Sequence, residues 1–250
     1  MALGLGITTE LLEKPVLLTP KEQGLASSLQ IWYENGKDIV LGTGSKVSRW
    51  LDQSGNDRNA SQTNILLQPT LSNGGVRLTA SNNEHMDIVD SSGSSAAFSI
   101  AQGGEFCVFM AIMPGSVNNQ VYLSDSTNEF IEIMTAKKFR FKGNDGGNLH
   151  SVLELPSNTF TENTRVVAFG RDSSDLLSIW VDGTSIAYDV GTSQNIINDR
   201  GFDIANIGVR DDSDRYVTGT ILELFMYNKY PAESKIENLN EYLMSKFSHL

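Results

Sequence analysis

The stretch of sequence that decides the fold lies near the C-terminal end of this 250-residue chain. Residues 219–227 read Gly-Thr-Ile-Leu-Glu-Leu-Phe-Met-Tyr. The predicted strand spans residues 217–227. Nearly every residue of it except Glu223 is apolar, as expected of a buried central β-strand. An amphipathic helix is predicted after Pro231, with Glu233 early and Lys246 late, as the helix dipole favours. Its apolar face repeats at helical spacing through Ile236, Leu239, Leu243 and Phe247.

A second informative stretch lies toward the other end of the chain. Residues 49–60 read Arg-Trp-Leu-Asp-Gln-Ser-Gly-Asn-Asp-Arg-Asn-Ala. They predict a strand that ends in a polar turn. We expect Asp52 and Ser54 to bond nearby backbone amides, and Gly55 to take a left-handed conformation. Trp50 is expected to pack at the edge of the fold.

Between these stretches, short apolar runs alternate with turn signals such as Asn73-Gly74-Gly75 and Pro114-Gly115. This spacing predicts a dozen or more strands in two packed sheets, within one domain over 29–250. The other predicted strands are 29–33, 47–51, 65–71, 76–79, 105–113, 120–124, 130–134, 137–142, 164–170, 176–181, 185–190 and 202–209.

The ordered set of motifs resembles the concanavalin A-like, laminin-G-like jelly-roll family over about residues 29–247. The resemblance implies an all-β, two-sheet antiparallel jelly-roll sandwich of the lectin and glucanase type, with one C-terminal amphipathic helix. These positions look scaffold-forming, and the fold hosts lectins, glucanases and structural modules, so no activity carries over. The matching residues are Trp50, Asp52, Ser54, Gly55, Asn56, Gln68-Pro69-Thr70, Val76-Arg77-Leu78, Val181-Asp182-Gly183, Gly219, Ile221, Glu223, Tyr227, Asn228, Tyr242, Leu243 and Lys246.

Charge and composition restrict the classes of partner that we expect for this chain. The formal net charge of −11 disfavours nucleic acid and anionic membranes. The single cysteine, Cys107, lies in an apolar run and is expected to be a buried, inert thiol. No signal peptide or transmembrane segment is recognised, and we expect synthesis in a reducing cytoplasm.

Residues 1–28 differ from the remainder and are predicted to form an N-terminal arm. Residues 1–7 alternate Gly with Leu and Ile, a pattern that favours a frayed end or an arm docked on its own or a neighbouring subunit. Such openings before a laminin-G-like module resemble virion proteins of tailed phages. That resemblance implies a capsid decoration or a tail or baseplate component, assembled in the bacterial host cytoplasm. Its partners would be other virion proteins and, through the arm, the chain itself.

Carboxylate patterns do not predict an enzyme. Glucanases of this fold carry a Glu-x-Asp-x-x-Glu run on one strand, which is absent here. The nearest pair, Glu129 and Glu132, is expected to point to opposite faces of a solvated hairpin. We therefore predict a non-enzymatic protein and assign no catalytic residue.

The three histidines do not predict a nucleophilic catalytic site or a zinc site. His85, His150 and His249 lie outside nucleophile–histidine motifs. In the run Glu84-His85-Met86-Asp87, neighbouring side chains face opposite sides of a strand, so a zinc site is not predicted.

Calcium is left open at one loop, where Asp211, Asp212 and Asp214 cluster. The bracketing Arg210 and Arg215 lower the need for a cation, and a solvated hairpin tip is the expected alternative. The turns at Asn56-Asp57 and 144–147 are weaker candidates. No cofactor-binding or metal-ligating residue is assigned.

Sugar binding is the alternative function, as a lectin-like module for host-surface glycans. It requires an exposed aromatic residue beside a polar cleft. Trp32, Trp50 and Trp180 lie within predicted strands and are expected to pack in the core. Tyr216, beside the acidic loop, is the nearest exposed candidate.

Overall fold

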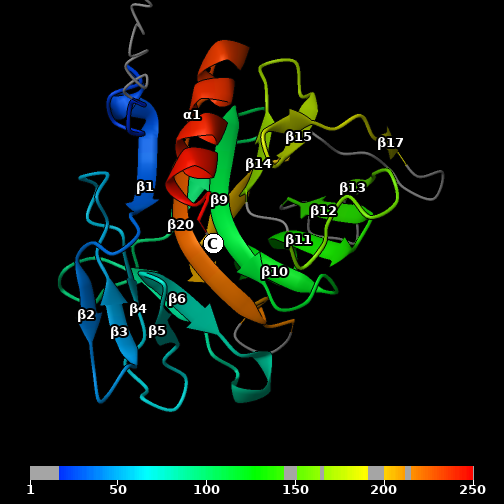
Figure 1. Cartoon of the computed structure of the whole chain (residues 1–250). Coiled ribbons are helices and arrows are strands. Elements are labelled where there is room, and N and C mark those ends of the chain that lie inside the picture. Colours follow the sequence, from blue (N-terminus) through cyan, green and yellow to red (C-terminus); the bar gives the residue numbers. More distant parts are fainter. Residues whose placement is uncertain (1–16, 144–150, 164–165, 191–199, 212–214, 250) are drawn as a thin grey trace, which may run out of the picture.

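The computed structural model describes residues 17–143, 151–163, 166–190, 200–211 and 215–249. Two antiparallel sheets pack face to face, and one helix lies against the outer side of the first sheet (Figure 1). The predicted all-β sandwich with a C-terminal helix is confirmed. Within the described ranges, no helix is long and apolar enough to cross a membrane.

The eight-stranded sheet runs in the order β16-β15-β14-β9-β20-β6-β5, and β1 also pairs with β20. All of its pairings are antiparallel. The strands are β1 (Leu29–Tyr33), β5 (Thr70–Ser72), β6 (Gly75–Leu78), β9 (Phe106–Pro114), β14 (Val166–Arg171), β15 (Leu177–Val181), β16 (Thr184–Ser185) and β20 (Gly219–Tyr227).

The ten-stranded sheet runs in the order β17-β13-β12-β11-β10-β19-β7-β4-β3-β2. Its strands are β2 (Ile39–Leu41), β3 (Val47–Trp50), β4 (Asn59–Ser61), β7 (Met86–Val89), β10 (Gln120–Ser126), β11 (Glu129–Thr135), β12 (Lys138–Lys142), β13 (Ser151–Glu154), β17 (Asp189–Val190) and β19 (Asn206–Ile207). A separate pair joins β8 (Phe98–Ile100) to β18 (Phe202–Ile204). Short 3₁₀ turns cover Ala26–Ser28 and Ala80–Asn82.

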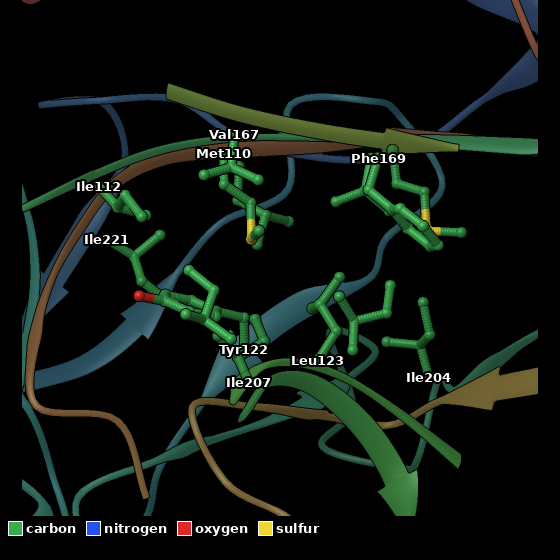
Figure 2. Close-up of a cluster of buried hydrophobic side chains, with 14 of the residues drawn as sticks. Met110, Ile112, Tyr122, Leu123, Val167, Phe169, Ile204, Ile207 and Ile221 are labelled. Atoms are coloured by element: carbon green, nitrogen blue, oxygen red, sulfur yellow. The ribbon is translucent and has the colours of Figure 1, made fainter. Parts of the chain in front are cut away.

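The core fills the space between the two sheets. Alternate side chains of the longer strands point inward, so each of these strands contributes one apolar row. Figure 2 shows side chains of β9, β14 and β20 facing those of β10, β18 and β19. The labelled members of this cluster are Met110, Ile112, Tyr122, Leu123, Val167, Phe169, Ile204, Ile207 and Ile221, and all are buried.

The predicted helix is α1 (Glu233–Lys246), which covers the outer face of the eight-stranded sheet beside β9 and β20 (Figure 1). Beneath it, Glu223 of β20 is fully buried. Its carboxylate accepts hydrogen bonds from Trp32 Nε1 at 3.0 Å, Tyr242 Oη at 2.9 Å and Lys246 Nζ at 2.7 Å. Burial, together with the Glu223 charge, raises the pKa of Tyr242 well above its usual value. This polar cluster joins β1, β20 and α1.

The turn after β3 connects the two sheets. Asp52 accepts from the backbone N–H of Trp32 at 2.9 Å and of Ser54 at 2.8 Å, and Gly55 has a φ of 99°. Asn56 donates to the carbonyl of Leu29 at 2.8 Å. The predicted turn chemistry is confirmed, and it ties β1 of the eight-stranded sheet to β3 of the other.

Several predicted strands were wrong in extent. The run 65–71 is not one strand, because residues 65–67 form a turn and β5 begins only at Thr70. The runs 185–190 and 202–209 each divide into two short strands, because the chain changes sheets within them. Apolar periodicity does not reveal such a crossing.

The described part of the arm, residues 17–28, packs against the sandwich. Leu17 and Leu25 contact the apolar cluster under α1. Tyr227 donates to the carbonyl of Pro20 at 2.9 Å, and Lys235 donates to the carbonyl of Gln23. Residues 1–16 lie outside the described residues, so the assembly role of the arm stays a prediction.

Candidate functional site

A cleft of about 360 Å³ opens where the chain passes from β16 to β17, and thus from one sheet to the other. It lies between the end of β13 and the segment that precedes β17. Its volume falls within the range of about 300–1,000 Å³ that is usual for ligand sites. The lining residues are Lys137, Glu154, Leu155, Pro156, Ser157, Ala187, Tyr188 and Asp189.

Tyr188 supplies the aromatic surface of this cleft. Its ring is half-buried and packs against the core, and its hydroxyl donates to the carbonyl of Leu177 at 2.6 Å. Burial, and to a lesser degree Asp172, raises the pKa of Tyr188. The ring is therefore held in one orientation, and only its open part is available to a ligand.

Charged groups of both signs surround the ring. Glu154 accepts from Lys138 Nζ at 2.7 Å, and that hydrogen bond and charge lower the pKa of the Glu154 carboxyl. Asp189 is exposed. Lys137 is exposed, and its ammonium makes no ion pair with any described residue. The charge of Lys137 also helps to lower the pKa of Glu154. The cleft thus offers carboxylate acceptors and an exposed cationic donor.

A second cavity, of about 390 Å³, shares Lys137 and Ser157 with the first. Its other lining residues add two amides, a hydroxyl and a second lysine. They are Asn118, Thr135, Ala136, Lys138 and Asn158. We call the two cavities together the Tyr188 cleft. Because the two cavities adjoin, the cleft suits a ligand longer than one small ring.

A separate groove of about 490 Å³ crosses the outer face of the eight-stranded sheet. Arg77 of β6, Thr220 of β20 and Met113 of β9 lie side by side there, because Thr220 pairs with both neighbours. Glu162 and Asn163 border it. The groove lacks an aromatic ring among its lining residues.

Three carboxylates meet near the β10–β11 hairpin. Ligand atoms of Asp125, Glu129 and Asp203 all lie within 4.8 Å of one another. Burial, and then the neighbouring acidic groups, raises the pKa values of Asp125 and Glu129. Oxygen donors of this kind suit a hard cation such as Ca²⁺, which neutralises mutual repulsion. The same spacing is close to the ~5 Å of retaining glycosidase pairs. None of the three cavities described above is lined by these carboxylates.

The expectation of a solvated hairpin for Glu129 and Glu132 was wrong, because both side chains are buried. Glu129 accepts from the N–H of Asp203 at 3.1 Å. Glu132 lies on the other face, where Arg140 donates from Nε at 2.6 Å and Arg215 from Nη1 at 2.9 Å. The opposite-face prediction holds, and each carboxylate has its own partners.

The acidic loop is therefore tied to the ten-stranded sheet through Arg215. Asp211 is exposed, and its charge contributes to the raised pKa of Asp125. Asp212 and Asp214 lie outside the described residues, as does the turn at 144–147, so the structure does not test calcium binding at these sites. The described metal-ligand group instead combines β10, β11 and β18, which no single loop of the sequence indicated.

The aromatic predictions had a mixed outcome. Trp32, Trp50 and Trp180 are buried, as predicted. Cys107 is also buried, and burial raises the pKa of its thiol well above the usual value. Tyr216 is half-buried against His85, with ring centroids 5.9 Å apart. Sequence reasoning missed Tyr188, because it placed residues 185–190 in one continuous strand.

Solved structures with the same fold include the binding domain of one toxin and a structure of a second toxin. The binding domain of Paraclostridial mosquitocidal protein 1 is 16% identical with a TM-score of 0.58, covering 87% of this chain and 53% of that chain. A structure of botulinum neurotoxin type C, whose cell entry depends on interaction with two ganglioside molecules, is 16% identical with a TM-score of 0.52. That match covers 88% of this chain and 52% of that chain.

A Trypanosoma rangeli sialidase is also similar, at 13% identity and a TM-score of 0.50, covering 88% of this chain and 33% of that chain. No family model and no curated protein sequence matches the chain. The chain spans about half the length of the mosquitocidal-protein and neurotoxin chains. At these identities the likeness shows the fold alone, and it confirms the concanavalin A-like sandwich. The named structures give the virion role no support, so that role stays a prediction.

Proposed function

We propose that this chain is a non-enzymatic carbohydrate-binding module and that its ligand occupies the Tyr188 cleft. The observation that carries the proposal is that the ring of Tyr188 lies beside charged and polar side chains in one preformed cleft. A sugar site needs an aromatic ring beside a polar cleft. Among the described residues, Tyr188 lines such a cleft, whereas Tyr216 lines none of the three cavities.

The chemistry of the cleft suits a sugar. One face of a pyranose ring is made of C–H groups and packs on an aromatic ring, while its hydroxyls need directional partners. Asp189 and Glu154 accept hydrogen bonds from sugar hydroxyls. Lys137 and Ser157 lie between the two cavities, so they contact adjoining units of an oligosaccharide.

The fold supports the proposal at a coarser level. The mosquitocidal-protein structure is a binding domain, and cell entry of botulinum neurotoxin type C depends on gangliosides, which are glycolipids. Because this chain spans only about half of those chains, their ligands are carried over only as a class. We therefore propose a glycan, without assigning a particular one.

A hydrolase is the less favoured function. The carboxylates near Glu129 have a suitable spacing, but they line none of the cavities described above. Both oxygens of Glu129 also accept hydrogen bonds, from Asp203 N–H and from Ser126 Oγ at 3.2 Å. A substrate in the Tyr188 cleft would not reach them.

Glycan-array screening followed by titration calorimetry tests the proposal. Tyr188→Ala should weaken binding by at least about tenfold, equivalent to about 1.4 kcal/mol. Lys137→Ala should also weaken it and leave the fold intact, because Lys137 is exposed and no ion pair joins it to another residue in the described part of the chain. Lys229→Ala is the matched control, because Lys229 is exposed and lines neither cavity of the Tyr188 cleft. The proposal fails if no glycan binds, or if Tyr188→Ala and Lys137→Ala bind as the unmodified chain does.

A further inference from the structure

The groove on the outer face of the eight-stranded sheet holds an arginine that the fold does not use. Its lining residues include none of those that line the Tyr188 cleft. Arg77 of β6 points to this outer face, because its neighbours Val76 and Leu78 belong to the core between the sheets. The residue is exposed, and its guanidinium makes no ion pair or hydrogen bond with any described residue. Its N–H donors are therefore available to a ligand.

Thr220 of β20 supplies a second unused polar group. It lies opposite Arg77 in the β6–β20 ladder, so the two side chains share one face. Only 7% of Thr220 is exposed, and its hydroxyl has no hydrogen-bond partner among the described residues. Buried hydroxyls are normally hydrogen-bonded, and a partner can reach this one through the groove that Thr220 lines. Ser72 and Thr79 add two more hydroxyls to the lining.

The charge of the groove differs between its two ends. Arg77 lies at the β6 end, and Glu162, its one acidic lining residue, lies in the segment before β14. The strands run in the order β6-β20-β9-β14, so β6 and β14 are roughly 14 Å apart at the usual strand spacing. Met113, Gly115 and Gly219 line the stretch between these ends. In Figure 1, β6 lies beside the lower part of β20, below α1, so the helix leaves this part of the sheet uncovered.

We propose that this groove is a second binding site, and that its ligand is an organic molecule carrying an oxyanion, namely a carboxylate, sulfate or phosphate group. The planar fork of the Arg77 guanidinium matches two oxygens of such a group, and the Thr220 hydroxyl donates a further hydrogen bond to it. The chain's net charge of −11 repels free anions, so the uncharged part of the ligand also has to contribute by packing across β20 and β9.

Titration of the full chain with small probes, followed by NMR of its backbone amides, tests the proposal. The probes are benzoate, phenyl sulfate and phenyl phosphate, and benzyl alcohol is their uncharged counterpart. At least one anionic probe should bind at least about tenfold more tightly than benzyl alcohol, and the tightest of the three identifies the oxyanion. The largest changes in chemical shift should fall on β6, β20 and β9 rather than on the Tyr188 cleft.

Three variants and one control assign the binding to the groove. Arg77→Gln should raise the dissociation constant at least about tenfold. Arg77→Lys should retain only part of the affinity, because lysine keeps the charge but lacks the planar fork. Thr220→Val removes the hydroxyl at nearly constant volume and should weaken binding about threefold or more. Arg49→Gln is the matched control, because it removes the same charge from β3 and Arg49 lines none of the three cavities.

Three outcomes would overturn the proposal. One is that no anionic probe binds more tightly than benzyl alcohol. Another is an equal effect of Arg77→Gln and Arg49→Gln, which would show that the probes respond only to net charge. A third is that inorganic sulfate and phosphate bind as tightly as their phenyl derivatives, which would show that the groove attracts small ions only. None of these outcomes depends on glycan binding at the Tyr188 cleft.

Discussion

Glu132 and Glu129 stand three residues apart on β11, and we predict opposite effects when each is replaced by glutamine. Glu132 is fully buried and receives hydrogen bonds from Arg140 and Arg215. Glutamine retains the shape and one oxygen acceptor, but it removes the negative charge. Both guanidinium groups would then lose their counterion, and the contact that holds Arg215 against β11 would weaken.

The size of the effect follows from the exposure of the two arginines. Removing one partner from a fully buried ion pair costs about 3–5 kcal/mol, because the remaining charge is buried alone. Here the side chains of Arg140 and Arg215 are 12% and 29% exposed, so water compensates in part. We therefore expect Glu132→Gln to lower the free energy of unfolding by about 2–3 kcal/mol. For a domain of this size that lowers Tm by about 4–12 °C.

Glu129→Gln is the control, with the opposite expected sign. Burial raises the pKa of Glu129, so its ionised form costs more in the folded state than in the unfolded state. Glu129→Gln should therefore raise stability at pH 7, with the gain disappearing as pH falls below the usual glutamate pKa of about 4.3. Urea unfolding at pH 7 and at low pH measures both variants. A loss below about 1 kcal/mol for Glu132→Gln, or equal effects at pH 7, would refute the argument.

Three further results are expected. Glu223→Gln should destabilise the protein by about 2–4 kcal/mol, because Lys246 loses its buried counterion; a change under about 1 kcal/mol in urea unfolding would contradict this. Gly75→Ala should cost more than about 2 kcal/mol, because its Cβ would lie 2.2 Å from the carbonyl oxygen of Ile221; a near-normal Tm would show that β6 and β20 separate easily. Ca²⁺ should raise Tm at pH 7 by binding the Asp125 and Glu129 carboxylates, and a chelator should reverse that rise in Tm. If Ca²⁺ raises the Tm of Glu129→Gln equally, the cation binds elsewhere.

Local chemistry made part of this structure predictable. The hydrogen bonds of Asp52 reach backbone amides, among them that of Ser54 two residues away, so the turn after β3 could be expected from its residues alone. The helix α1 was equally predictable, because its apolar residues recur on one face and that face is buried by packing against a sheet. The buried tryptophans followed from their place within apolar strands.

The candidate site was not predictable in the same way. Tyr188 and Glu154 are far apart in the sequence and meet only where β13 and β17 pair. The carboxylate group at Asp125, Glu129 and Asp203 likewise depends on β18 lying beside the β10–β11 hairpin. The spacing of residues within one segment does not reveal which residues from distant segments lie close together in the fold.

The amino-acid sequence by itself determined the class of fold, the closing strand and helix, and the polar turn after β3. These features depend on residues close in the chain, where periodicity and hydrogen-bonding capacity act directly. Only the tertiary structure decided which side chains share a cleft, which carboxylates meet and which apolar residues remain exposed. Those outcomes depend on strand order and register, which arise from packing both sheets over one common core.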